Sequence, residues 1–193
     1  MKRFVSAALL IMIAFSLSAQ LKLKDQRDGN IYKTYKVQGV IWMAENLRYK
    51  APQGSNYFDK DPTNLRSYGM LYDWKTAMQV CPAGWRLPTG DEFQSLINSK
   101  DQEESWKSDK SATPDSFGIQ LGGMQDYEGT FTEMEESAYF WTSTEYNKEN
   151  AQYVSYLIIT ENPVVDVSRA EDIDDVHGTE KSNKYSVRCI KAR

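Results

Sequence analysis

The sequence is poor in the side chains that most catalytic and metal sites use. It holds one histidine, His177, and two cysteines, Cys81 and Cys189, in 193 residues. A Ser-His-Asp or Cys-His arrangement would have to use His177, which stands in a polar run beside Gly178. A structural zinc site takes four ligands, and these three residues are too few. Acidic residues are too dispersed to nominate a hydrolytic pair. We therefore expect no catalytic residues.

The chain also has fewer basic residues than acidic ones. The chain has 23 Lys and Arg residues against 27 Asp and Glu residues, a formal net charge of −4. Without Lys2 and Arg3 the ratio becomes 21 to 27, a charge of −6. Nucleic acids and anionic membranes both need a basic face, so an acidic chain predicts neither partner.

No hydrophobic run is long enough to span a bilayer. Residues 4–17 are apolar, but this run is shorter than the roughly 20 residues that a spanning helix needs. It follows Lys2 and Arg3 and precedes the small residues Ser18 and Ala19, a pattern typical of a secretory signal peptide. We expect cleavage after Ala19, with no transmembrane segment in the mature chain.

The domain organisation follows from that cleavage. Residues 1–19 are predicted to be the signal peptide, 20–27 a mobile lead-in and 28–193 a single domain, with no internal repeat or linker. The protein is expected to be secreted, whether into the periplasm, to the cell surface or to the medium. In an exported chain, two cysteines favour one disulfide. From composition alone, a zinc site and a catalytic thiol remain the competing interpretations.

Two helix signals stand close together. Asp73 is a good N-cap, and Trp74, Ala77, Met78 and Cys81 follow at the spacing of one buried helix face, with Pro82 ending the helix near Cys81. The second helix starts with a capping box formed by Thr89 and Glu92.

The buried face of this second helix should be Phe93, Leu96 and Ile97. Trp85 lies in the short connection and is expected to fill the gap between the two helices.

Several strands surround these helices. Residues 31–37 alternate, and Gln38-Gly39 turns them into 40–43, which predicts a hairpin. Glu45 and Asn46 are expected to hydrogen-bond backbone in the turn that follows. The remaining strands are predicted at residues 117–121 (ended by Gly122-Gly123), 139–144 with Phe140 and Trp141 in the core, 153–159, 163–167 and 185–191. Residues 49–67 should be a long loop. The fold class is α+β, with two helices packed on one twisted, mostly antiparallel sheet.

Five short motifs resemble the Fibrobacter succinogenes major paralogous domain, which is common in secreted proteins of Bacteroidetes-type bacteria. They are IWMAENL (41–47), YGMLYDW (68–74), CPAGWRLPT (81–89), FWTSTE (140–145) and SVRCIK (186–191). More distantly, the arrangement resembles C-type lectin-like domains. These place one cysteine after a first helix and its partner in the last strand. Both resemblances imply a disulfide between Cys81 and Cys189, and the second implies a lectin-like fold.

A ligand surface is predicted in the loops between residues 160 and 184. Lectin-like domains that bind calcium do so there, and this chain offers Glu161, Asn162, Glu171, Asp172, Asp174 and Asp175. The order Glu-Asn-Pro differs from the Glu-Pro-Asn of sugar-binding lectins, so a solvated acidic loop is the competing interpretation. We expect a non-catalytic binding or adhesion module for a glycan or a protein. The alternative is a secreted enzyme acting on surface glycans.

Overall fold

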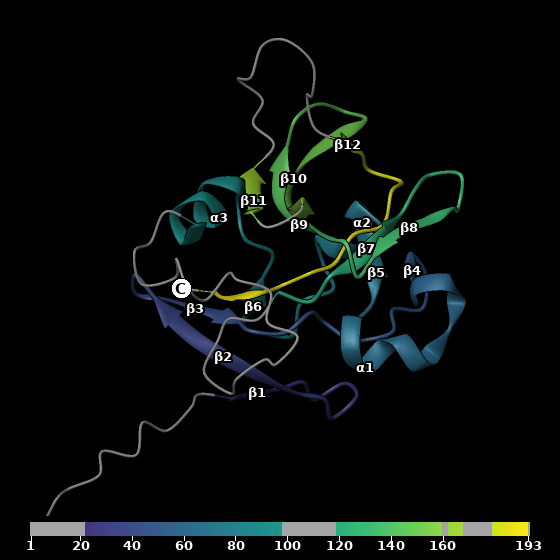
Figure 1. Ribbon diagram of the computed structural model, residues 1–193. Coiled ribbons are helices and arrows are strands. Elements are labelled where there is room, and N and C mark those ends of the chain that lie inside the picture. Colours follow the sequence, from purple (N-terminus) through teal and green to yellow (C-terminus); the bar gives the residue numbers. More distant parts are fainter. Residues whose placement is uncertain (1–21, 98–118, 160–161, 168–178, 193) are drawn as a thin grey trace, which may run out of the picture.

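The computed structural model describes residues 22–97, 119–159, 162–167 and 179–192. They form a mostly-sheet α+β fold in which curled antiparallel sheets dominate and helices are few and short. The prediction of α+β is confirmed at that level. Two main sheets take the place of the one expected, because the C-terminal part of the chain runs between them (Figure 1).

The first sheet has five strands in the order β1-β2-β3-β13-β6. These are β1 (Lys22–Lys24), β2 (Ile31–Val37), β3 (Val40–Met43), β13 (Ile190–Lys191) and β6 (Trp85–Arg86). Strands β2 and β3 form the predicted hairpin, with Val37 opposite Val40 and only Gln38 and Gly39 in the turn. The alternating pattern and the two-residue turn therefore fixed the register correctly.

The second sheet has the order β11-β10-β9-β7-β8, and β12 also pairs with β10. Its strands are β7 (Gly122–Gln125), β8 (Phe131–Met134), β9 (Ser137–Glu145), β10 (Asn150–Ile159), β11 (Asn162–Val167) and β12 (Thr179–Glu180). A parallel link joins β7 to β9, and the other pairings are antiparallel. The strands expected at 139–144, 153–159 and 163–167 are confirmed. A small separate sheet pairs β4 (Ser55–Asn56) with β5 (Leu71–Tyr72).

The strand predicted at 117–121 is wrong in its described part, and residues 117–118 lie outside the described residues. Residues 119–121 are not in a strand, and β7 begins at Gly122, where the strand was expected to end. A side chain on Gly123 would place its Cβ 2.3 Å from the carbonyl oxygen of Thr132 on β8. The glycine is there because the two strands approach too closely for a side chain, not because the strand stops.

The expected mobile lead-in is also wrong in its described part. Residues 22–24 form β1, which pairs with β2 and buries Leu23 against the core. Asp25, in the following turn, is fully buried. The prediction of a mobile segment was based on its polar composition. Composition does not show that the Asp25 carboxylate is neutralised by a neighbouring residue in the folded chain.

The helices are shorter and more numerous than predicted. Residues 49–67, expected to be loop, contain the one-turn segments η1 (Phe58–Lys60) and η2 (Pro62–Asn64) and the start of α1 (Leu65–Tyr68). The two predicted helices are α2 (Trp74–Ala77) and α3 (Gly90–Ile97). No helix among the described residues is long and apolar enough to cross a membrane.

Helix α2 begins as predicted but ends early. The Asp73 carboxylate accepts the Thr76 amide at 2.8 Å, which confirms the cap. The helix stops after one turn, so Met78 is 45% exposed and not part of the buried face. Val80 is buried in its place. The half-buried Trp74 donates its Nε1 hydrogen to the carbonyl of Thr142 at 2.8 Å.

Helix α3 has the predicted capping box. The Glu92 amide donates to Oγ1 of Thr89 at 3.2 Å, and the Thr89 amide donates to Oε2 of Glu92 at 2.9 Å. Phe93 and Leu96 are buried, as expected. Arg86 on β6 binds the same Glu92 carboxylate through both of its terminal nitrogens, which ties the helix to the first sheet. The neighbouring Trp85 pairs with Lys191 on β13.

The C-terminal segment, residues 184–191, crosses the middle of the molecule (yellow in Figure 1). Only β13 in it is a regular strand, so the strand expected over 185–191 is mostly wrong. Instead, its backbone carbonyls accept hydrogen bonds from different sheets: Tyr185 accepts the amide of Tyr72, and Ser186 accepts the amide of Trp141. Residues 185–190 are all buried. Trp141 is fully buried beside Tyr185, at 4.4 Å between ring centroids, and donates to the Tyr72 carbonyl.

A polar cluster lies under this segment. Asn46 is fully buried and donates through Nδ2 to the Tyr68 carbonyl at 2.9 Å and to Ser186, while its Oδ1 accepts from Nε of Arg188 at 3.0 Å. Burial lowers the pKa of Arg188 to about 9, which leaves it charged at neutral pH. Glu45 accepts the Lys33 amide. Glu45 and Asn46 thus bind backbone, as predicted, but the backbone of Lys33 on β2 and of Tyr68 and not that of their own turn.

The disulfide between Cys81 and Cys189 is present, and its ends are separated by 108 positions in the sequence. It joins the chain just after α2 to the C-terminal segment, which confirms the pairing.

We expect intact mass after alkylation to show no free thiol in the native protein. Replacing both cysteines by serine should lower the free energy of unfolding by about 2–5 kcal/mol, because the unfolded chain gains freedom. Two alkylated thiols in native, unreduced protein would contradict the pairing.

Candidate functional site

The predicted ligand residues lie almost entirely outside the described part of the chain. Glu161, Glu171, Asp172, Asp174 and Asp175 all fall there, as does His177. Asn162 is the first residue of β11 and pairs with Ile159. Calcium binding by this loop therefore stays a prediction. Among the described residues, no group of three or more His, Cys, Asp and Glu side chains is placed to hold a metal ion.

Two open grooves lie elsewhere, on the loops between β1 and α2. The α1 groove has a volume of about 670 Å³. It is lined by Gly29, Asn30, Ile31, Glu45, Arg48, Pro62, Leu65 and Arg66. The α2 groove has a volume of about 570 Å³. It is lined by Arg27, Tyr49, Ala51, Pro52, Gln53, Gly54, Asp73, Lys75, Thr76, Gln79 and Val80. Both volumes are in the range of small-molecule sites.

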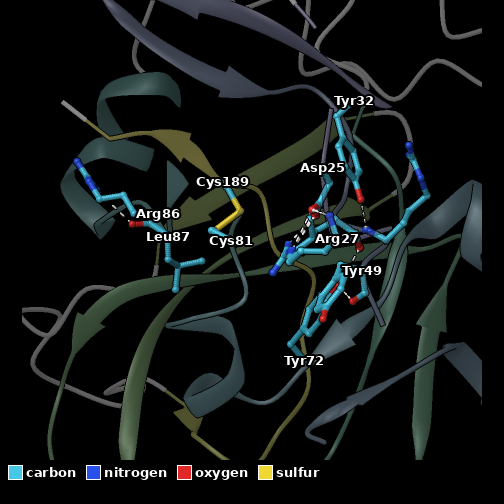
Figure 2. The surroundings of a disulfide bond; sticks show 11 residues. Asp25, Arg27, Tyr32, Tyr49, Tyr72, Cys81, Arg86, Leu87 and Cys189 are labelled. Atoms are coloured by element: carbon cyan, nitrogen blue, oxygen red, sulfur yellow. Dashed lines mark hydrogen bonds and ion pairs between the residues drawn. A yellow bond between two sulfur atoms is a disulfide. The ribbon is translucent and has the colours of Figure 1, made fainter. Parts of the chain in front are cut away.

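Arg27 is held on two sides where it lines the α2 groove. Its Nε and Nη2 bind the Asp25 carboxylate at 2.9 and 2.6 Å, and its guanidinium lies 3.8 Å from the centroid of the Tyr49 ring. Figure 2 shows the guanidinium between this carboxylate and this ring. The Asp25 side chain is 1% exposed and that of Arg27 31%. A buried anion thus anchors a cation whose remaining surface faces the α2 groove.

The electrostatics of this pair are consistent with both groups being charged. Burial raises the pKa of the Asp25 carboxyl, but the hydrogen bonds and charge of Arg27 outweigh it, and the net pKa lies below its ordinary value. The hydrogen bond to Asp25 in turn raises the pKa of Arg27.

Two buried tyrosines support the same loop from beneath. The Tyr32 hydroxyl accepts the Arg48 amide at 3.0 Å, and the Tyr72 hydroxyl donates to the Tyr49 carbonyl at 2.6 Å (Figure 2). Burial raises the pKa of Tyr32 to about 12, so its hydroxyl stays protonated at neutral pH. The backbone at residues 48 and 49 is thereby fixed on both sides.

The first turn of α2 also lines the α2 groove. The Gly54 carbonyl accepts the Asp73 amide at 2.9 Å, which docks the loop against the helix start. A Cβ on Gly54 would lie 2.0 Å from Oγ1 of Thr76, and its φ of +71° also favours glycine. The shape of the groove is therefore set by backbone contacts and a helix cap.

The two grooves differ in how their polar side chains are used. At the α1 groove, Arg48 binds Glu45 at 2.5 Å and the Ile31 carbonyl at 2.8 Å, and Asn30 binds Asp28. At the α2 groove, several polar ends have no hydrogen-bond partner among the described residues. They are Nη1 of Arg27, the hydroxyl of Tyr49 and the side-chain ends of Gln53, Lys75 and Gln79.

Sequence reasoning missed these residues. Arg27 was assigned to the lead-in and Tyr49 to a surface loop, because neither has a periodic pattern around it. Two local patterns could have indicated them. Asp25 and Arg27 are two positions apart, before an Asp-Gly turn. Farther along, a tyrosine stands between two cationic residues at positions 48–50. Each of these cations lies over a tyrosine ring from another part of the chain.

Comparison with known proteins gives one positive result. The family model described as Fibrobacter succinogenes major domain matches residues 35–191. No curated protein matches the chain, and no solved structure does. The matched residues include Tyr49 and the whole of α2, whereas Asp25 and Arg27 precede the match.

We expect Asp25→Asn to lower the free energy of unfolding by roughly 1–3 kcal/mol at pH 7, because Arg27 loses a charged partner. The folded pKa of Asp25 lies below the ordinary value of about 3.9, so its contribution is complete above that value and is lost as pH falls through the folded pKa. Urea unfolding of both proteins should show the difference closing between pH 7 and pH 2. The exposed control Asp28→Asn should stay within about 0.5 kcal/mol. A difference for Asp25→Asn that does not change with pH would contradict the ion pair.

Proposed function

Because the chain belongs to the Fibrobacter succinogenes major domain family, we propose that it is a secreted, non-catalytic binding module whose ligand grooves are built on a rigid scaffold. The observation that carries this proposal is the pair of open, loop-built grooves on a frame held by the disulfide and by the ion pair of the buried Asp25 with Arg27. Fixed loops lose little conformational entropy when a ligand binds, which favours a recognition surface.

The scaffold we propose is related to C-type lectin-like domains. Three features support this assignment. A disulfide links the chain after α2 to the C-terminal segment, α3 follows soon after the first cysteine, and β13 lies beside β3 so that the two ends of the domain meet in one sheet. In such a scaffold the loops vary while the frame is kept.

Export is part of the same proposal. The disulfide joins cysteines 108 positions apart in the sequence, and such bonds persist in an oxidising compartment. The sequence also begins with a pattern typical of a signal peptide.

We expect N-terminal sequencing of the exported protein to begin at Gln20, or within one or two residues of it. A mature protein that still begins at Met1 would contradict export by this route.

Binding is tested most directly with glycan and protein arrays probed with the exported protein. We expect at least one ligand class to bind, and the signal to fall in a variant with both grooves altered by Arg66→Glu and Lys75→Glu. Each array is run with calcium and with chelator. A signal that requires calcium would place the ligand in the acidic loop at 161–175. Release of cleaved glycan products during incubation would contradict a non-catalytic module.

A further inference from the structure

The α2 groove has the features of a preformed site for one class of ligand. Its polar ends are mostly hydrogen-bond donors: the free edge of the Arg27 guanidinium, the ammonium of Lys75 and the hydroxyl of Tyr49. One oxygen of the Asp73 carboxylate on the same wall, Oδ1, accepts the Thr76 amide as the cap of α2. A surplus of donors favours a ligand that carries an anionic acceptor.

Arg27 is already in a fixed position before any ligand arrives. Asp25 holds one edge of its guanidinium, and the Tyr49 ring covers one face. A flexible arginine would lose rotamer freedom on binding, whereas this one has lost it on folding. The planar fork that remains matches a carboxylate group better than a point charge would.

The other side chains favour a saccharide over a peptide. Gln53 and Gln79 each present a donor and an acceptor, as sugar hydroxyl groups require. Among the described lining residues the aliphatic ones are Ala51, Pro52 and Val80, and Val80 is 3% exposed, while the Arg27 guanidinium lies over the ring of Tyr49. Little surface is therefore available for the apolar side chains that anchor peptides. The groove volume of about 570 Å³ suits a short stretch of sugar units.

We propose that the groove between Arg27, Tyr49 and helix α2 binds a carboxylate-bearing saccharide, with Arg27 and Lys75 on the carboxylate and Gln53 and Gln79 on the hydroxyl groups. This inference rests on the proposed binding function and specifies its site and its ligand class. It differs from the calcium loop predicted from the sequence, because it uses neither a metal ion nor any residue beyond position 80.

The test is isothermal titration of the exported full-length protein with tetragalacturonate and with its methyl ester. The two probes share sugar rings and differ in charge. We expect the ester to bind about tenfold more weakly or worse, since charge-assisted hydrogen bonds to the carboxylate are lost. Lys75→Glu should weaken tetragalacturonate binding by at least about tenfold. Gln79→Ala should weaken both probes about equally, by a few-fold.

The matched control is Arg66→Glu, the same change of charge on an exposed residue of the α1 groove. It should alter binding of tetragalacturonate by less than about twofold, because Arg66 does not line the α2 groove and interactions between exposed charges that are not in contact are weakened by salt. Unchanged thermal melts of both charge variants would show that neither has unfolded. Equal losses for Lys75→Glu and Arg66→Glu would overturn the assignment to the α2 groove.

The outcomes also separate this inference from the proposed function. If acid and ester bind equally, or if the arrays find only neutral glycans or proteins, the acidic-saccharide assignment is wrong and the binding function stands. If tetragalacturonate and every array member fail to bind a folded protein, both are wrong.

Discussion

The whole fold depends on the backbone carbonyls of the C-terminal segment, which accept hydrogen bonds from separate parts of the chain. Carbonyls of this segment accept amides from both main sheets and from the chain between them: Cys189 accepts from Met43 on β3, Val187 from Leu47, Tyr185 from Tyr72 on β5 and Ser186 from Trp141 on β9. A buried backbone group left unpaired would cost as much as a lost hydrogen bond, so both sheets must keep their places beside the segment. The disulfide then ties the segment to the chain after α2, and the buried Asn46–Arg188 contact fixes it from beneath.

The α2 groove is built on this frame. The loop after β3 is held at residues 48 and 49 by hydrogen bonds between its backbone and the hydroxyl groups of the buried Tyr32 and Tyr72. Asp25 is buried there and requires a cation, and Arg27 supplies it. Arg27 therefore neutralises a buried carboxylate with one edge of its guanidinium and presents the other edge to the groove. The proposed recognition uses a side chain that also stabilises the fold.

The sequence predicted those parts of the fold that depend on neighbours along the chain. The β2–β3 hairpin, the cap of α2 and the capping box of α3 each involve residues within a few positions of one another, and all are present. Other features depend on contacts with distant segments, which the periodicity of the sequence does not encode. They are the length of α2, the start of β7 at Gly122 and the formation of strand β1 where a mobile segment was predicted. The α2 groove was missed for the same reason: Arg27, Tyr49 and Lys75 come from three separate segments and become neighbours only after folding.

Native-state hydrogen exchange tests the central claim, that one shared segment joins both sheets into a single cooperative unit. The amides of Met43, Leu47, Tyr72 and Trp141 all donate to carbonyls between residues 185 and 189. If the segment joins the sheets, these four amides exchange only through global unfolding and share one free energy of opening, equal to that measured with denaturant. If the Trp141 amide instead opens at a distinctly lower free energy than the other three, the second sheet unfolds independently and the account is wrong.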